Sequence, residues 1–91
     1  MEKIEFNAIV RAIELFLAMN GFTRNEKYSY INNGCNVVIT HDGFEVADAS
    51  GTTMYSKDHN IYWLIGILTY YNHIPKNYKT EPLPKIKFYC R

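Results

Sequence analysis

Three turn-forming dipeptides at a nearly regular spacing constrain the fold of this 91-residue chain more than any other feature. Asn33-Gly34 and Asp42-Gly43 are favoured in two-residue hairpin turns, where both residues must accept a positive φ, and Ser50-Gly51 is a third pair of this kind. Such a series predicts an antiparallel β-meander of three or four strands. The expected strands span residues 26–31, 35–41, 44–49 and 52–55.

An amphipathic helix is expected before this meander and a second helix after it. From Ile4 to Met19, apolar residues recur at the three- and four-residue spacing of one helix face, and Gly21 suits the left-handed end of that helix. Ser56 is a suitable N-cap for the second helix, which we expect to run to about Tyr71 or Asn72. The predicted fold is a single α+β domain, a two-layer sandwich with both helices on one face of the sheet.

The C-terminal part of the chain is basic and carries one further strand signal. Residues 72–84 hold all three prolines and are typical of a loop. Residues 85–90 alternate between lysine or tyrosine and apolar residues, which favours a last strand at an edge of the sheet.

Composition places the chain among ordinary folded proteins. Hydrophobic residues make up 47% and charged residues 21%, and the formal net charge is +1. These values argue against a disordered chain and against a surface built wholly to grip nucleic acid or anionic lipid. Charges in the first twenty residues argue against a secretory signal, and the apolar run 61–71 is too short to span a membrane. Cys35 and Cys90 form no CxxC pair and are expected to be free thiols, so we expect a cytoplasmic protein.

The second helix is apolar on two faces. One face is expected to contact the core and consists of Ile61, Leu64, Ile65 and Leu68. The opposite row consists of Trp63, Ile67 and Tyr70, and Ile74 would extend it if the helix continued that far. Three interpretations remain open: the row is internal, it contacts another protein, or it lines a small-molecule groove. Gly66 in mid-helix suggests close approach of another backbone, from within the chain or from a partner.

We favour a non-enzymatic protein-binding domain that forms a homodimer through Trp63, Ile67, Tyr70 and Ile74. Aromatic residues dominate the energetics of protein interfaces. The helix would occlude or scaffold its partner, as in a small inhibitor or accessory protein of a phage or mobile element.

Enzymatic and metal-dependent functions lack a supporting motif. No nucleophile elbow, phosphate-binding glycine loop or carboxylate pair is present. His41, His59 and His73 lie far apart and do not fit a zinc-ligand spacing with the cysteines. We therefore expect no catalytic residue, metal or cofactor.

Nucleic-acid binding is the alternative function. Tyrosines beside cations can form a stacking surface for single strands. The residues concerned are Lys27, Tyr28, Tyr30, Lys85 and Lys87.

Overall fold

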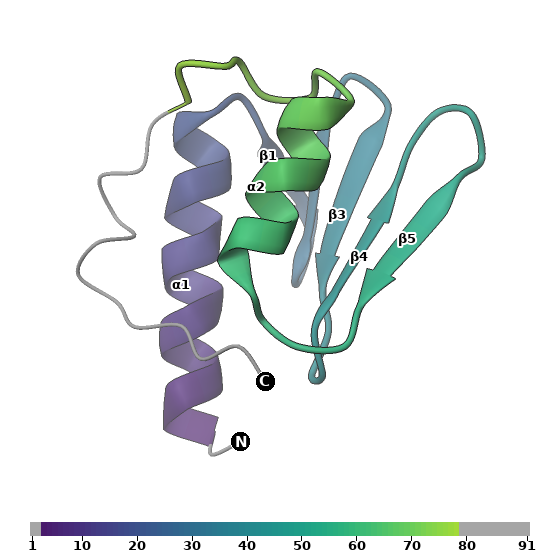
Figure 1. The fold of residues 1–91 in the computed structure, drawn as a ribbon. Helices are drawn as coiled ribbons and strands as arrows, with labels where there is room; N and C mark the ends of the chain where they lie inside the picture. Colours follow the sequence, from purple (N-terminus) through teal and green to yellow (C-terminus); the bar gives the residue numbers. More distant parts are fainter. Residues whose placement is uncertain (1–2, 79–91) are drawn as a thin grey trace.

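The computed structural model describes residues 3–78, with side chains from residue 6 onward. Its elements, in chain order, are α1 (Lys3–Met19), β1 (Thr23–Glu26), β2 (Ser29–Asn32), β3 (Cys35–Ile39), β4 (Phe44–Ala47), β5 (Thr53–Ser56) and α2 (Ile61–Tyr70). The five strands form one antiparallel meander in the order β1-β2-β3-β4-β5 (Figure 1). The predicted α+β two-layer fold is confirmed, with five strands instead of three or four.

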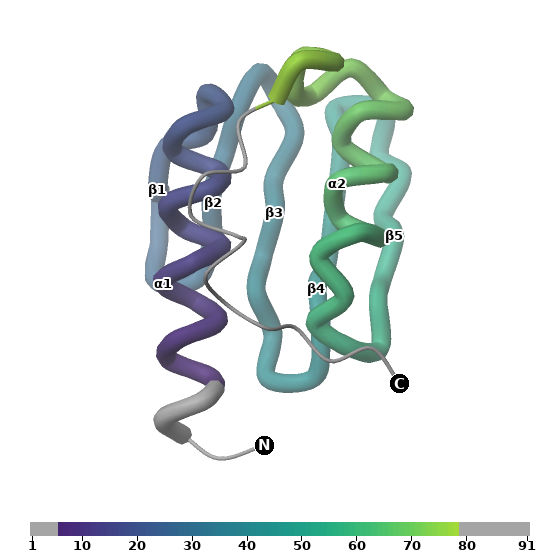
Figure 2. The backbone as a smooth tube through the Cα atoms, turned by 60° about the vertical axis from the view of Figure 1, so that its left-hand side comes forward, coloured from purple at the N-terminus to yellow at the C-terminus, as the bar shows by residue number. Residues whose placement is uncertain are grey.

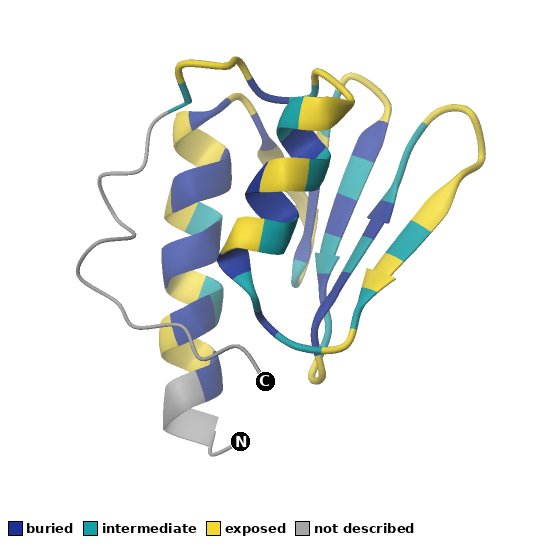
Figure 3. Ribbon diagram, in the orientation of Figure 1, coloured by how far each residue is buried: buried dark blue, intermediate teal, exposed yellow. Residues whose placement is uncertain are grey.

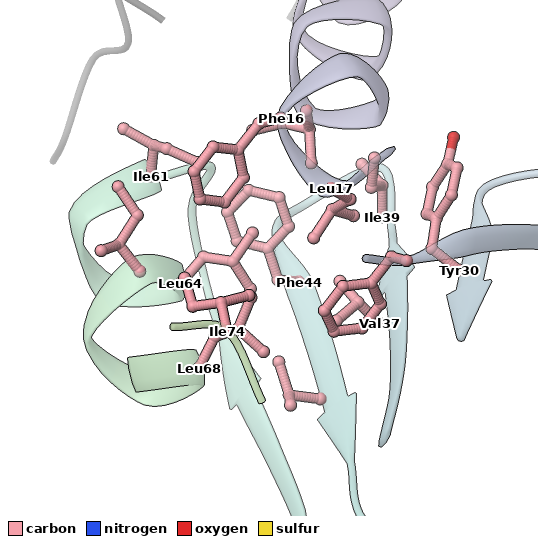
Figure 4. Close-up of a cluster of buried hydrophobic side chains, with 14 of the residues drawn as sticks. Phe16, Leu17, Tyr30, Val37, Ile39, Phe44, Ile61, Leu64, Leu68 and Ile74 are labelled. Atoms are coloured by element: carbon pink, nitrogen blue, oxygen red, sulfur yellow. The ribbon is translucent and has the colours of Figure 1, made fainter. Parts of the chain in front are cut away.

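Both helices cover the same face of the sheet, α1 over β1 and β2, and α2 over β4 (Figure 2). Tyr30, Val37 and Val46 are cross-strand neighbours on that face, and all three are buried. Figure 4 shows side chains from both helices and from the sheet meeting between the layers. On the other face, residues such as Val38 and Glu45 are only half-buried (Figure 3). The core therefore lies on one side of the sheet.

The first helix forms and ends as its sequence pattern predicts. Ile13, Phe16 and Leu17 are fully buried along one stripe. Gly21 has a φ of +98°, and the amide of Phe22 donates to the carbonyl of Leu17 at 2.9 Å, which closes the helix.

Strand β1 was not predicted, because its residues were interpreted as a polar connection. All four residues of Thr23–Glu26 are exposed, so the strand carries no alternation of apolar and polar side chains. Backbone pairing with β2 holds it in the sheet, with a register shift between Arg24 and Glu26. The predicted strand 26–31 was wrong at its start, because Tyr28 turns the chain at a φ of +68° and β2 begins at Ser29.

The two aspartate- or asparagine-glycine turns differ in their geometry. Asn33 and Gly34 have φ angles of +48° and +82°, as predicted. Gly43 does not have a positive φ. A Cβ at Gly43 would lie 2.0 Å from the carbonyl oxygen of Ser56. Glycine is required there because β5 approaches closely, and not because of turn conformation.

The second helix begins later than predicted. Ser56 is not its N-cap but the last residue of β5, paired with Phe44. Asn60 caps the helix instead, and its Oδ1 accepts from the amides of Tyr62 at 2.9 Å and Trp63 at 3.3 Å. The predicted strand over residues 85–90 lies outside the described residues. Across residues 3–78, no helix is both long and apolar enough to cross a membrane.

Candidate functional site

The core-facing stripe of α2 is as predicted, whereas the opposite row is divided by the end of the helix. Ile61, Leu64, Ile65 and Leu68 are all buried. The helix ends at Tyr70, and the amides of His73 and Ile74 donate to the carbonyl of Leu68 at 2.8 and 3.3 Å. This turn brings Ile74 into the core, where it is 3% exposed (Figure 4). Ile74 therefore does not extend the surface row.

Trp63 and Ile67 occupy an intermediate position between core and solvent. Both are half-buried and pack against the core cluster. The indole of Trp63 stacks on Phe44, with ring centroids 6.5 Å apart and an interplanar angle of 8°. Tyr70 is 77% exposed and makes an edge-to-face contact with Tyr71 at 4.8 Å. The row is thus neither fully internal nor fully exposed.

The contacts of α2 with its neighbours fix the direction of this row. Gly66, Thr69 and Tyr70 line an open hollow of about 430 Å³ together with Lys76 and Tyr78. That hollow lies on the side of α1, because the ring of Tyr78 meets that of Phe16 at 6.4 Å.

Trp63 and Ile67 lie on the other flank of α2, away from α1, where Trp63 stacks on Phe44 of β4. The neighbour of β4 at this edge of the sheet is β5. Met54 of β5 pairs with Val46 and therefore points to the same layer, where it is half-buried. We call Met54, Trp63 and Ile67 the α2–β5 flank. Sequence reasoning missed Met54, whose signal was its alternation with two exposed residues, Thr53 and Tyr55.

Gly66 has no close neighbour among the described residues. A Cβ built there meets nothing within 4 Å. The expected close approach of another part of the described chain is therefore not found, and this glycine lies exposed on α2.

A second hollow, of about 180 Å³, lies between α1 and the first two strands. Its basic residues are Arg11, Arg24 and Lys27, and Glu14 is its one acid. Arg11 was not among the predicted contacts, because sequence alone placed it only on the polar face of α1. The fold thus gathers three cations from different elements around one opening.

The two tyrosines predicted for base stacking, Tyr28 and Tyr30, both contact other side chains of the protein. Tyr30 is buried, and its hydroxyl donates to Glu14 Oε2 at 2.9 Å. Burial, followed by the contact with Glu14, raises the pKa of Tyr30 far above its usual range. Tyr28 packs edge-on against Phe6 at 5.6 Å, and the ammonium of Lys27 lies 5.2 Å from its ring centroid. Tyr30 therefore offers no ring face to a base. Lys85 and Lys87 lie outside the described residues.

Two titratable residues of the core, His59 and Cys35, are buried within the fold. His59 is buried between Phe6 and Phe44, and its Nε2 lies 2.8 Å from the carbonyl oxygen of Thr40. Cys35 is buried as a free thiol, and burial, aided by the charge of Asp48, raises its pKa to about 11. In the described part of the chain, no group of three or more His, Cys, Asp or Glu residues is placed to hold a metal ion.

Comparison with known families, curated proteins and solved structures finds no match to this chain. The fold by itself defines the class of this protein, which is a two-layer α+β domain with a helix–meander–helix order.

Proposed function

We propose that this protein is a small, non-enzymatic protein-binding domain of the cytoplasm that self-associates through the second face of α2. Trp63 and Ile67 are the contact residues, and Tyr70, which lies nearer to α1, borders them. The observation that carries the proposal is that this face presents large apolar and aromatic side chains that the described residues leave partly or largely exposed. Such patches on small domains are typical of protein interfaces.

The geometry of Trp63 supports its role as an anchor. Its ring is held parallel to Phe44, and this contact fixes its orientation before any partner arrives. A preordered aromatic side chain loses little conformational entropy on binding, so more of its contact energy contributes to affinity. Ile67 lies one turn further along the helix and also packs on the core, which adds a second ordered apolar contact.

Sedimentation velocity with Ile67→Glu tests this proposal. The wild-type protein is expected to sediment as a dimer, and Ile67→Glu as a folded monomer, because the carboxylate would be desolvated in the interface. Leu15→Glu is the matched control. It places the same charge on α1, at an apolar residue that is 45% exposed, and should leave the dimer intact.

The outcomes separate the three interpretations of the row. A wild-type protein that stays monomeric at high concentration would exclude self-association. Loss of the folded circular dichroism spectrum in Ile67→Glu would identify Ile67 as an internal residue. If Leu15→Glu dissociates the dimer, the interface involves α1.

Anion or nucleic-acid binding is a second candidate, favoured by the convergence of Arg11, Arg24 and Lys27 on one hollow. Such a site binds phosphate through charge, so affinity should fall steeply as salt rises. Arg24→Gln should weaken retention on heparin or single-stranded DNA at low salt. Absence of retention by the wild-type protein would exclude this candidate.

A further inference from the structure

The two edges of the sheet are built differently. The edge strand β1 carries Arg24 and Glu26, and its pairing with β2 shifts register in the middle. Charges and irregular pairing are the usual devices that keep an edge strand from pairing with another chain. Strand β5, Thr53–Ser56, has no charged residue and pairs with β4 in regular register throughout. No other strand of residues 3–78 lies beyond it.

The backbone groups that β5 presents outward can be assigned from its pairing with β4. The amide of Asp48 donates to the carbonyl of Thr52 at 3.0 Å, so these two residues form a hydrogen-bonded pair. Bonded and non-bonded pairs alternate along an antiparallel ladder. Met54 therefore also bonds to β4, whereas Thr53 and Tyr55 direct their N–H and C=O groups away from it. Among residues 3–78, these two residues form the free edge of the sheet at β5.

This edge is complementary to itself. If two copies of β5 lie antiparallel with Met54 opposite Met54, Thr53 of each copy faces Tyr55 of the other. Both residues of each such pair have outward N–H and C=O groups, so each pair makes two hydrogen bonds. The arrangement has two-fold symmetry, which is the commonest symmetry of homodimers.

The side chains beside the edge fit the same arrangement. Met54 points to the helix layer and is only half-buried. Trp63 and Ile67 lie on the same flank of α2 and are also half-buried. A second copy placed across the two-fold axis would bring its own α2–β5 flank to this position, and its apolar side chains would cover the exposed parts of all three residues.

We propose that two copies of this chain join through β5, with Met54 on the two-fold axis and the two sheets continuous across the dimer. The proposal rests on the self-association proposed above and specifies its geometry. The main-chain bonds set the register, and the α2–β5 flanks supply the apolar contact.

Disulfide trapping tests the register in the full chain with Cys90→Ser, so that buried Cys35 is the remaining native thiol. Met54→Cys would place two thiols at a non-bonded cross-strand pair, where Cα atoms lie about 4.5 Å apart, close enough for a disulfide. Tyr55→Cys is the control. Tyr55 is more exposed, at 66%, but its two copies would be two residues out of register. We expect Met54→Cys to cross-link under mild oxidation and Tyr55→Cys to cross-link far more slowly.

A backbone substitution tests the hydrogen bonds. Thr53→Pro removes an N–H that points away from β4, so the strand can keep its place in the monomer. Thr53→Ala keeps that N–H and is the matched control. Loss of two of the four intermolecular bonds should raise the dimer dissociation constant by about 30-fold in Thr53→Pro, and Thr53→Ala should stay close to wild type. Circular dichroism spectra would establish that both variants are folded.

The outcomes distinguish this geometry from the broader proposal. If Ile67→Glu dissociates the dimer while Thr53→Pro does not, and Tyr55→Cys cross-links as fast as Met54→Cys, edge pairing is wrong and self-association through α2 stands. If Thr53→Pro dissociates the dimer and Ile67→Glu does not, edge pairing stands and the α2 contact is wrong. A monomeric wild-type protein would overturn both.

Discussion

Replacing Gly43 with alanine is expected to be among the most damaging small substitutions in this chain. The added Cβ would lie 2.0 Å from the carbonyl oxygen of Ser56 and 2.9 Å from the amide nitrogen of Asp58, and real Cβ contacts stay above about 3.0 Å. Both obstacles are backbone atoms, so no side chain can rotate away. The start of β4 must therefore move away from the end of β5 by about 1 Å.

The expected loss of stability can be estimated from what this movement disrupts. Phe44 and Ser56 are directly opposed beside Gly43, and their pair belongs to the hydrogen-bonded set. Losing two backbone bonds costs about 2 kcal/mol, and overpacking adds about 1–3 kcal/mol. The sum, about 3–5 kcal/mol, is a large share of the stability of a domain of this size. It corresponds to a fall of about 12–40 °C in Tm.

Urea unfolding followed by the fluorescence of Trp63, the only tryptophan, measures this loss. Gly66→Ala is the matched control, because neither glycine has a positive φ and only the surrounding space differs. Alanine at the open helical position 66 should raise stability by about 1 kcal/mol. A cost below about 1 kcal/mol for Gly43→Ala would refute the close approach of β5, and with it the assigned position of the free edge.

Two further predictions concern buried titratable groups. Tyr30→Phe removes the hydrogen bond to Glu14 and should cost about 1 kcal/mol at pH 7. The pKa of Tyr30 is raised on folding, so its contribution is present below the unfolded pKa of about 10 and is lost as pH rises above it. Urea titrations from pH 7 to 11 should therefore show a shallower alkaline loss in Tyr30→Phe, and parallel profiles would contradict the assignment. Cys35, with a pKa of about 11, should resist a disulfide reagent at pH 8 in Cys90→Ser protein until the chain unfolds. Rapid reaction of the native protein would show that this thiol is accessible.

The sequence predicted the elements whose side chains alternate between core and solvent. Phe16 and Leu17 identify the buried stripe of α1 because helical spacing alone places them together. The turn at Asn33-Gly34 was equally predictable, since its positive φ angles restrict the residues that fit. Strand β1 escaped detection because backbone pairing holds it and its side chains are all exposed.

The candidate surface was predicted only in part. Helical period separated Trp63 and Ile67 from the buried stripe, but it could not show which flank of α2 they occupy. Ile74 was assigned to the surface because the helix was expected to be longer, whereas the turn after Tyr70 buries it. Arg11 and Arg24 come together only when β1 packs beside α1, a contact that no local pattern encodes.

The sequence by itself determined the α+β class, the meander and the two apolar faces of α2, because periodicity and turn chemistry act over a few residues. Tertiary structure alone decided that Ser56 ends a strand while Asn60 caps the helix, since both residue types can cap and pairing with Phe44 selects between them. It also decided that Met54 joins Trp63 and Ile67 on one flank. Such choices depend on contacts between distant segments, whose loop-closure entropy is offset only when the whole sheet forms.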